Sequence, residues 1–75
     1  MKISVFGLGY VGSVTAACLA DQGFEVIGVD VNRDKVDWIN RGQAPVLEAQ
    51  LNEKVERSVK AGRLAATTDA ATAIA

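Results

Sequence analysis

The spacing of hydrophobic residues near the N-terminus changes from a strand pattern to a helical pattern and back. Residues 2–6 form a short apolar run that ends at a glycine, which is typical of a buried strand. Residues 11–22 then carry small and apolar side chains at roughly helical spacing, and residues 25–30 return to a short run rich in β-branched side chains. The helical stripe consists of Val11, Val14, Ala17, Cys18 and Leu19. With Gly23 where a C-terminal helix glycine belongs, this order predicts a strand, a helix and a second strand.

A short helix capped by Asn32 is predicted next. Asparagine is favourable at the position before the first helical turn, and Gly42 follows the end of the pattern at about Asn40. The side chains expected to face the sheet are Val36 and Ile39, with Trp38 as a further candidate.

The remaining residues predict another helix and a third strand. A helix is expected from about residue 48 to residue 61, and Gly62 ends it. Its apolar stripe consists of Leu51, Val55 and Val59. Residues 63–68 are predicted as a third parallel strand because they follow a crossover helix, although alanine is a poor strand former. Asp69 can cap a final helix over residues 70–75, so we expect the chain to end inside an element.

Three glycines after the first strand have the spacing Gly-x-Gly-x-x-Gly. Gly7 permits a tight turn, Gly9 lets the backbone approach a pyrophosphate, and Gly12 lets the helix pack closely. The helix begins near Tyr10 or Val11, where unpaired N–H groups and the helix dipole favour phosphate oxygens. The spacing alone is also compatible with a sharp turn and nothing more. The strand before it, the helix after it and a carboxylate at the end of the next strand favour dinucleotide binding.

That carboxylate, Asp30, bears on the choice of cofactor. It can accept hydrogen bonds from both hydroxyls of the adenine ribose and would repel the extra phosphate of NADP, which favours NAD. Arg33 is the counter-argument, because an arginine just beyond this strand can bind a 2′-phosphate, although it can also be a solvated first-turn residue. Lys35 is a candidate for contacts to ribose or phosphate oxygens, and a surface lysine is the alternative.

Strands joined by crossover helices predict an α/β fold. We expect the N-terminal half of a Rossmann (doubly wound) fold, with three parallel strands in the order 3-2-1. Residues 1–75 would form a partial NAD-binding domain without the later strands and the catalytic domain. The first strand then has an open edge, and right-handed crossovers leave one sheet face bare. Strand residues expected on that face are Ile3, Val5, Val26 or Val29. Self-association through the strand edge or the sheet face is therefore predicted.

Composition excludes several classes of function. Apolar residues make up 49% of the chain and the net charge is −1, so nucleic acid is not an expected partner. The apolar runs are too short to span a membrane and the chain begins with a strand rather than a signal peptide, so we expect a cytoplasmic protein with no membrane partner. Cys18 is the only cysteine and histidine is missing, which argues against a disulfide framework and a metal site. Within a helix of small apolar residues, Cys18 is interpreted as a packed thiol.

Two stretches carry a resemblance beyond the general fold. Residues 1–12, Met-Lys-Ile-Ser-Val-Phe-Gly-Leu-Gly-Tyr-Val-Gly, and residues 23–32, Gly-Phe-Glu-Val-Ile-Gly-Val-Asp-Val-Asn, resemble the N-terminus of the nucleotide-sugar 6-dehydrogenases. This family includes UDP-glucose and GDP-mannose dehydrogenases, and the sequence is most similar to the GDP-mannose type. Similarity continues through residues 35–42, 62–64 and 67–69, hence over essentially the whole chain.

The resemblance implies an activity of a parent enzyme. Family members oxidise the sugar C6 alcohol of a nucleotide sugar to a carboxylate with two NAD, through a thiohemiacetal and a thioester on a cysteine, in polysaccharide biosynthesis. That cysteine belongs to a region beyond residue 75, Cys18 does not match it, and the family's catalytic lysine, asparagine and aspartate are missing as well. No catalytic residue is therefore assigned, and this chain alone is predicted to be inactive. The cofactor contacts that carry over are Gly7, Gly9, Tyr10, Val11, Gly12, Asp30 and Lys35.

One departure from the family and two alternatives stay open. The family usually has Glu-Pro-Gly-Leu where this chain has Glu48-Ala49-Gln50-Leu51, and losing proline and glycine makes a helix easier to start there. The chain could instead be a stand-alone nucleotide-binding or self-assembling module without a reaction. It could also belong to a different NAD- or FAD-dependent oxidoreductase, which would explain the glycines and Asp30 but not the similarity that extends to Thr68.

Overall fold

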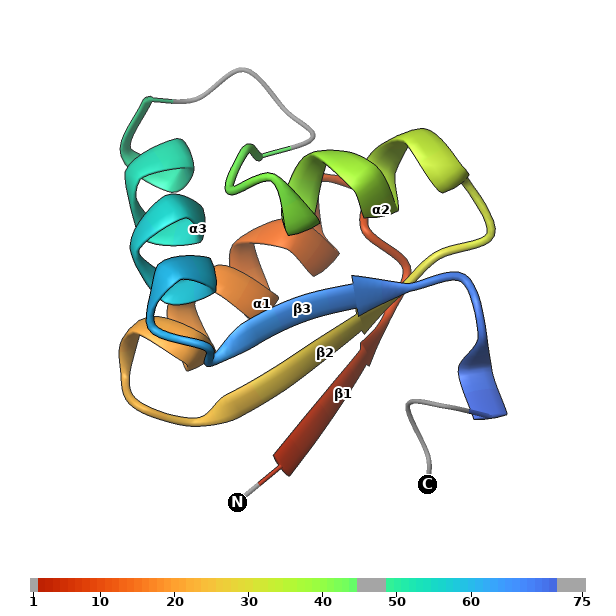
Figure 1. Ribbon diagram of the computed structural model, residues 1–75, viewed down its shortest axis with the longest axis horizontal. Helices are drawn as coiled ribbons and strands as arrows, with labels where there is room; N and C mark the ends of the chain where they lie inside the picture. The colour runs from red at the N-terminus through yellow and green to blue at the C-terminus, as the bar shows by residue number, and fades with distance from the viewer. Residues whose placement is uncertain (1, 45–48, 72–75) are drawn as a thin grey trace.

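Parallel strands joined by helices form a single sheet with a helical layer. The computed structural model describes residues 2–44 and 49–71. The elements are β1 (Lys2–Phe6), α1 (Tyr10–Asp21), β2 (Glu25–Val29), α2 (Arg33–Asn40), α3 (Ala49–Lys60) and β3 (Leu64–Thr67). The strands lie in the order β1-β2-β3, which confirms the predicted order 3-2-1 read from the other edge. Helices α1, α2 and α3 cover the same face of the sheet, whereas helical residues 70–71 lie apart from this layer (Figure 1).

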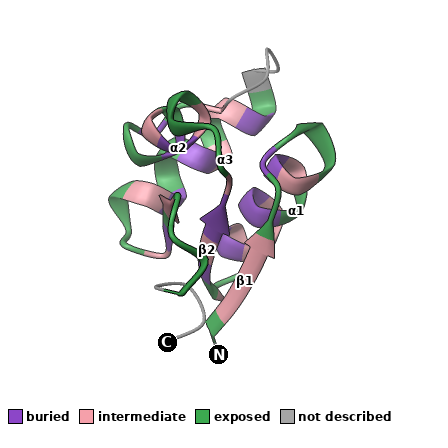
Figure 2. Cartoon of the chain, turned by 90° about the vertical axis from the view of Figure 1, so that its right-hand side faces the viewer, coloured by how far each residue is buried: buried purple, intermediate pink, exposed green. Residues whose placement is uncertain are grey.

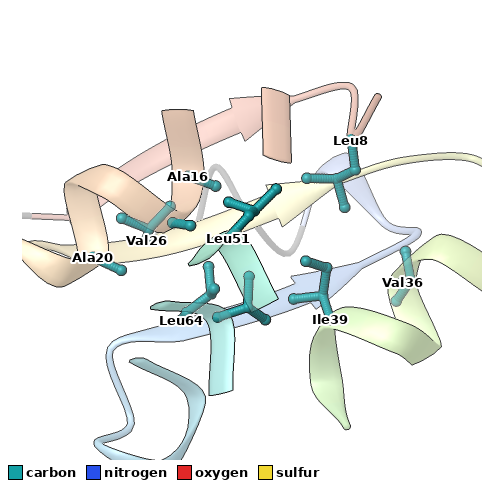
Figure 3. Packing of buried hydrophobic residues seen from close by; sticks show 10 residues of the cluster. Leu8, Ala16, Ala20, Val26, Val36, Ile39, Leu51 and Leu64 are labelled. Carbon is teal, nitrogen blue, oxygen red and sulfur yellow. The ribbon is translucent and has the colours of Figure 1, made fainter. Parts of the chain in front are cut away.

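The core lies between that face and the helices. Val26 of β2 pairs with Leu64 of β3, and both are nearly inaccessible to solvent. They pack with small residues of α1 and with larger apolar residues of α2 and α3 (Figure 3). The helical members of this cluster are Ala16, Ala17, Ala20, Val36, Ile39, Leu51 and Val55. Figure 2 shows β2 largely buried at the centre and β1 only partly covered at the edge of the sheet.

The structure corrects the predicted phase of the strands. Ile3 pairs with Val26, so these residues share a face, and Val5 packs against the core cluster on the same side. Ile3, Val5 and Val26 were therefore wrongly expected on the bare face. Only Val29 lies on the opposite face, because side chains alternate along a strand. The run of β-branched residues occupies both faces of β2, so its composition does not reveal which residues point to the helices.

α1 buries its smallest side chains. The face toward the sheet consists of Ser13, Ala16, Ala17 and Ala20. Val11 is 76% exposed, so its predicted place on the apolar stripe was wrong, and Val14, Cys18 and Leu19 are only partly buried. Small residues allow the helix axis to approach the strands, which is why the larger side chains stand at its flanks.

α2 and α3 match their predicted patterns. Asn32 caps α2 by accepting hydrogen bonds from the backbone N–H groups of Asp34 and Lys35, and α2 buries Val36 and Ile39 but leaves Trp38 42% exposed. The described part of α3 begins at Ala49, and the helix buries Leu51 and Val55, with Val59 packed beside them. The predicted helix start at Glu48 lies outside the described residues.

The C-terminal strand is slightly shorter than predicted, and a side chain of α2 occupies its outer edge at Ala66. β3 covers Leu64–Thr67 rather than residues 63–68, and Ala71 donates its N–H to Asp69 Oδ1 as the predicted cap requires. Residues 72–75 of the predicted final helix lie outside the described residues. Asn40, the last residue of α2, bonds β3 twice, because its Nδ2 donates to the Ala66 carbonyl at 3.0 Å and its Oδ1 accepts from the Ala66 N–H at 2.9 Å.

Within residues 2–44 and 49–71, none of the helices combines the length and the apolar character that crossing a membrane requires.

Candidate functional site

The glycine turn between β1 and α1 uses its three glycines differently. Gly7 has φ +92°, a backbone conformation that other residues rarely adopt. A Cβ on Gly12 would collide with the carbonyl oxygen of Gly7, so the start of α1 requires a glycine there. Gly9 has an extended backbone with φ −72°, and a Cβ on it would meet nothing within 4 Å. The fold therefore explains Gly7 and Gly12, whereas Gly9 faces open space.

The N-terminus of α1 presents unpaired backbone donors beside this space. Ser13 donates the first helical hydrogen bond, to the Gly9 carbonyl, so the N–H groups of Tyr10, Val11 and Gly12 have no carbonyl of the helix to bond. Gly9 makes no side-chain cap, and the first turn has no acidic residue. The side chains of Tyr10 and Val11 are 61% and 76% exposed. This arrangement suits a phosphate group, because the donors and the positive end of the helix dipole face the same side.

Asp30 is tied directly to the glycine turn. Its Oδ2 accepts the Leu8 N–H at 2.7 Å and its Oδ1 accepts the Asn32 N–H at 2.8 Å. These two bonds, with the positive charge of Lys35, hold the pKa of the Asp30 carboxyl below its usual value despite some desolvation. A carboxylate offers about four acceptor positions, so the two N–H groups leave room for two ribose hydroxyls. Asp30 is therefore ionised, oriented and able to accept further hydrogen bonds.

The two cations near Asp30 differ in their surroundings. Lys35 is partly buried in the first turn of α2, and its charge acts on the Asp30 carboxylate. Arg33 is the first residue of α2 and is exposed. The predicted site residues thus come together at the carboxyl ends of β1 and β2, with the glycine turn on one side and Asp30 and Lys35 on the other.

A shallow hollow adjoins the turn and Asp30 on the sheet face opposite the helices. Its wall combines the ends of β1, β2 and β3, with Phe6, Gly7, Val29, Asp30, Val31, Thr68 and Ala70. Phe6 is 58% exposed and Val31 is 94% exposed, although both are apolar. Val31 and Thr68 were not predicted as site residues. Both lie just after the carboxyl end of a strand, where ligands of such sheets bind, and this position could have indicated them.

Two further residues of the turn were missed. Leu8 is fully buried and belongs to the core cluster, so its side chain anchors the turn to the core (Figure 3). Ser13 is also fully buried, and its hydroxyl donates to the Leu8 carbonyl at 3.0 Å. Cys18 takes no part in the turn. It is partly buried on α1 with Lys54 Nζ 3.9 Å from its sulfur.

Comparisons with known proteins agree with this geometry. Residues 1–75 match the family model described as the UDP-glucose/GDP-mannose dehydrogenase family, NAD binding domain. The chain is 50% identical over 74 residues to a GDP-mannose 6-dehydrogenase of Pseudomonas syringae, covering 99% of the chain and 17% of that protein. It is 49% identical over 69 residues to a UDP-glucose 6-dehydrogenase of Haloferax volcanii, covering 92% of the chain and 16% of that protein.

A solved structure shows the same backbone. The crystal structure of a ternary complex of GDP-mannose dehydrogenase from Pseudomonas aeruginosa superposes with a TM-score of 0.96 at 50% identity. The match covers 99% of this chain and 17% of that one. The chain therefore spans less than a fifth of the length of the relatives it matches.

Proposed function

The chain belongs to the UDP-glucose/GDP-mannose dehydrogenase family, whose NAD-binding domain it matches, and we propose that it holds the adenosine-diphosphate part of NAD. The cofactor of this family domain is NAD, and the relatives are dehydrogenases of nucleotide sugars. The proposal concerns which residues of this chain bind which part of NAD. It also treats the chain as the first part of a Rossmann domain.

The observation that carries the proposal is the pairing of phosphate donors with an oriented carboxylate. The N–H groups at the start of α1 and the Asp30 carboxylate lie at one end of the sheet and are linked through Leu8. Dinucleotides need both kinds of group at this spacing, because a pyrophosphate accepts hydrogen bonds and a ribose donates them. Gly9 has no conformational or packing reason to be a glycine, and close approach of a phosphate supplies one.

Each predicted residue has a role in this proposal. The N–H groups of Tyr10 and Val11 bind pyrophosphate oxygens, with Gly7 and Gly12 shaping the turn. Asp30 accepts from the ribose hydroxyls, and Lys35 adds positive charge beside them. A 2′-phosphate would stand against an ionised carboxylate, which supports NAD over NADP even with Arg33 nearby.

The activity of the parent enzyme is part of the proposal. A nucleotide-sugar 6-dehydrogenase would oxidise the C6 alcohol of its substrate to a carboxylate with two NAD, which supply the hydride acceptors. This chain would bind and orient the cofactor, and the nucleophile and the other catalytic groups would come from elsewhere in the parent. Cys18 is partly buried beside Lys54 rather than in the turn, which supports its exclusion as that nucleophile. The chain alone is then inactive, in a cytoplasmic parent protein.

A second candidate function is self-association. β1 is an edge strand among the described strands, and Phe6 at its end is 58% exposed. An unpaired strand edge beside exposed apolar surface favours pairing with a second copy. Measuring the mass of the chain in solution at several concentrations tests this candidate, and a monomer at all of them would rule it out.

Titration followed by NMR tests the main proposal. The chain is titrated with NAD, ADP-ribose and NADP while backbone amide shifts are recorded. We expect saturable shifts at Gly9, Val11 and Asp30 with NAD and ADP-ribose, and weaker binding of NADP. A folded chain without saturable shifts would contradict the proposal.

A charge variant identifies the residue that selects the cofactor. Asp30→Asn removes the negative charge, so we expect the preference for NAD over NADP to fall by roughly tenfold. Asp34→Asn is the matched control, because Asp34 is an exposed carboxylate of the first turn of α2. An equal change of preference in both variants would show that general surface charge, and not Asp30, selects the cofactor.

A further inference from the structure

Leu8 is fixed at three points in the middle of the glycine turn. Its N–H donates to Asp30 Oδ2 at 2.7 Å, and its carbonyl accepts from the Ser13 hydroxyl at 3.0 Å. Its side chain is fully buried against Gly28, where even an added Cβ would lie 2.7 Å from Leu8 Cδ2. A segment with glycines on both sides is intrinsically free to move. These three contacts restrain it, together with the hydrogen bond from the Gly7 N–H to the Val29 carbonyl at 2.7 Å.

The hydrogen bond from the Ser13 hydroxyl to the Leu8 carbonyl also affects the N–H of the same peptide group, which belongs to Gly9. The carbonyl of Leu8 and the N–H of Gly9 belong to one planar trans peptide group and point in opposite directions. Because the carbonyl points toward buried Ser13, the Gly9 N–H points away from the core. Gly9 is exposed and has open space beside its Cα. The Ser13 hydroxyl thus sets the direction of an N–H that it does not touch.

We propose that Ser13 is a positioning residue for the cofactor phosphates, which holds the Leu8–Gly9 peptide with its N–H directed at them. The inference rests on the proposed function, since it takes the pyrophosphate of NAD as the ligand of the turn. Donors that are oriented before binding cost no ordering on binding, and a single hydroxyl behind the turn provides that order. Ser13 itself makes no contact with the ligand.

Ser58 offers a matched contrast on α3. Both serines are fully buried on helices that pack on the core, but Ser58 Oγ has no hydrogen-bond partner among the described residues. Ser58→Ala therefore removes a buried hydroxyl with no connection to the turn. Ser13→Ala removes the same atom where it holds the Leu8 carbonyl.

The test compares two ligands on these two variants of the 75-residue chain. ADP and adenosine are titrated separately, and affinities are read from amide shifts. For Ser13→Ala we expect about a threefold to tenfold loss of affinity for ADP, the effect of one net hydrogen bond, and less than about a twofold change for adenosine. Ser58→Ala should leave both affinities unchanged. An equal loss for both ligands in Ser13→Ala, or no loss for ADP, would overturn the inference.

A second measurement needs no ligand. Backbone ¹⁵N relaxation reports the order of the Gly9 amide, which should fall in Ser13→Ala and stay at the wild-type value in Ser58→Ala. Unchanged order at Gly9 in Ser13→Ala would overturn the inference. If the wild-type chain binds no ADP, the proposed function fails, whereas the Gly9 measurement still decides whether Ser13 orders the turn.

Discussion

The β1–α1 turn and the α2–α3 layer are built on opposite rules. In the turn, apolar side chains such as Tyr10 and Val11 are exposed, while polar groups of Ser13 and Asp30 bond to backbone atoms. In the helical layer, Val36, Ile39, Leu51 and Val55 are buried and the charged residues are on the surface. The layer contributes four apolar side chains to the core, whereas the turn contributes Leu8 and otherwise depends on hydrogen bonds to its backbone. The difference teaches that side-chain packing organises the layer, whereas hydrogen bonds to the backbone organise the turn.

Substitution of two glycines of the turn should have the largest effects, one on stability and the other on NAD affinity. Gly12→Ala should destabilise the fold by roughly 3 kcal/mol, the upper part of the range for overpacking, because its Cβ would collide with the Gly7 carbonyl. Gly9→Ala should change stability by less than about 0.5 kcal/mol, because its φ suits alanine and its surroundings are empty. The Gly9 variant should instead lose at least about tenfold in NAD affinity, since a methyl group would occupy the space that a phosphate approaches. Urea unfolding and NAD titration measure the two quantities.

Both outcomes of the glycine pair are informative. A Gly9→Ala protein as unstable as Gly12→Ala would show that the fold itself requires a glycine at position 9. Unchanged NAD affinity in Gly9→Ala would remove the ligand-based reason for that glycine.

Two valines provide a pair with identical chemistry and a smaller effect. Val55→Ala removes two methyl groups from the core and should cost about 2 kcal/mol of stability, with no change in NAD affinity of the folded chain. Val31→Ala, at a side chain that is 94% exposed beside Asp30, should cost less than about 0.5 kcal/mol. If Val31→Ala has an effect, we expect a change in NAD affinity, because Val31 lines the hollow. Loss of stability in Val31→Ala similar to that in Val55→Ala would contradict the division.

The smallest expected effect is the pH dependence that Asp30 adds to stability. The N–H groups of Leu8 and Asn32, with Lys35, lower the pKa of Asp30 in the folded chain. Asp30 therefore stabilises the fold above the pKa of the unfolded chain, about 3.9, and this contribution is lost as the pH falls through the lower folded pKa. Asp30→Asn should flatten the dependence of unfolding midpoints on pH below about pH 4 and leave the slope above about pH 5 unchanged.

Asp21 serves as the reference for that measurement. A hydrogen bond from Arg57 lowers the pKa of the Asp21 carboxyl, so this residue gives a slope in the same pH range. The part of the pH dependence that comes from Asp21 should remain in Asp30→Asn and disappear in Asp21→Asn. If Asp30→Asn has the slope of the wild-type chain, the bonds between Asp30 and the turn do not stabilise the fold.

Local signals explain what could be predicted from the sequence. Asn32 before a short helix, the stripe of Leu51 and Val55, and the glycines before Asp30 each determine structure within a few residues, and the structure confirms the elements they predict. The strand residues that were assigned to the wrong face depend on partners far along the chain. Val26 was placed on the wrong face because its direction depends on the register of β2 with β1 and β3.

The site shows the same limit. Ser13 reads as an ordinary small residue of a helix, and Leu8 as a spacer between glycines. Their roles depend on the turn folding back over α1 and β2, which brings Leu8 N–H to Asp30 across 22 positions. No pattern within the turn itself indicates that contact.

The double hydrogen bond between Asn40 and Ala66 limits strand pairing at the outer edge of β3. The side-chain amide occupies both backbone groups at the middle of β3, as a neighbouring strand would. Two copies that pair through β1 would then offer further copies β3 edges whose Ala66 groups are already bonded. Such edges disfavour growth beyond a dimer, because growth into a fibre needs two open edges on every copy. One asparagine at the end of a helix thereby favours a dimer over a fibre.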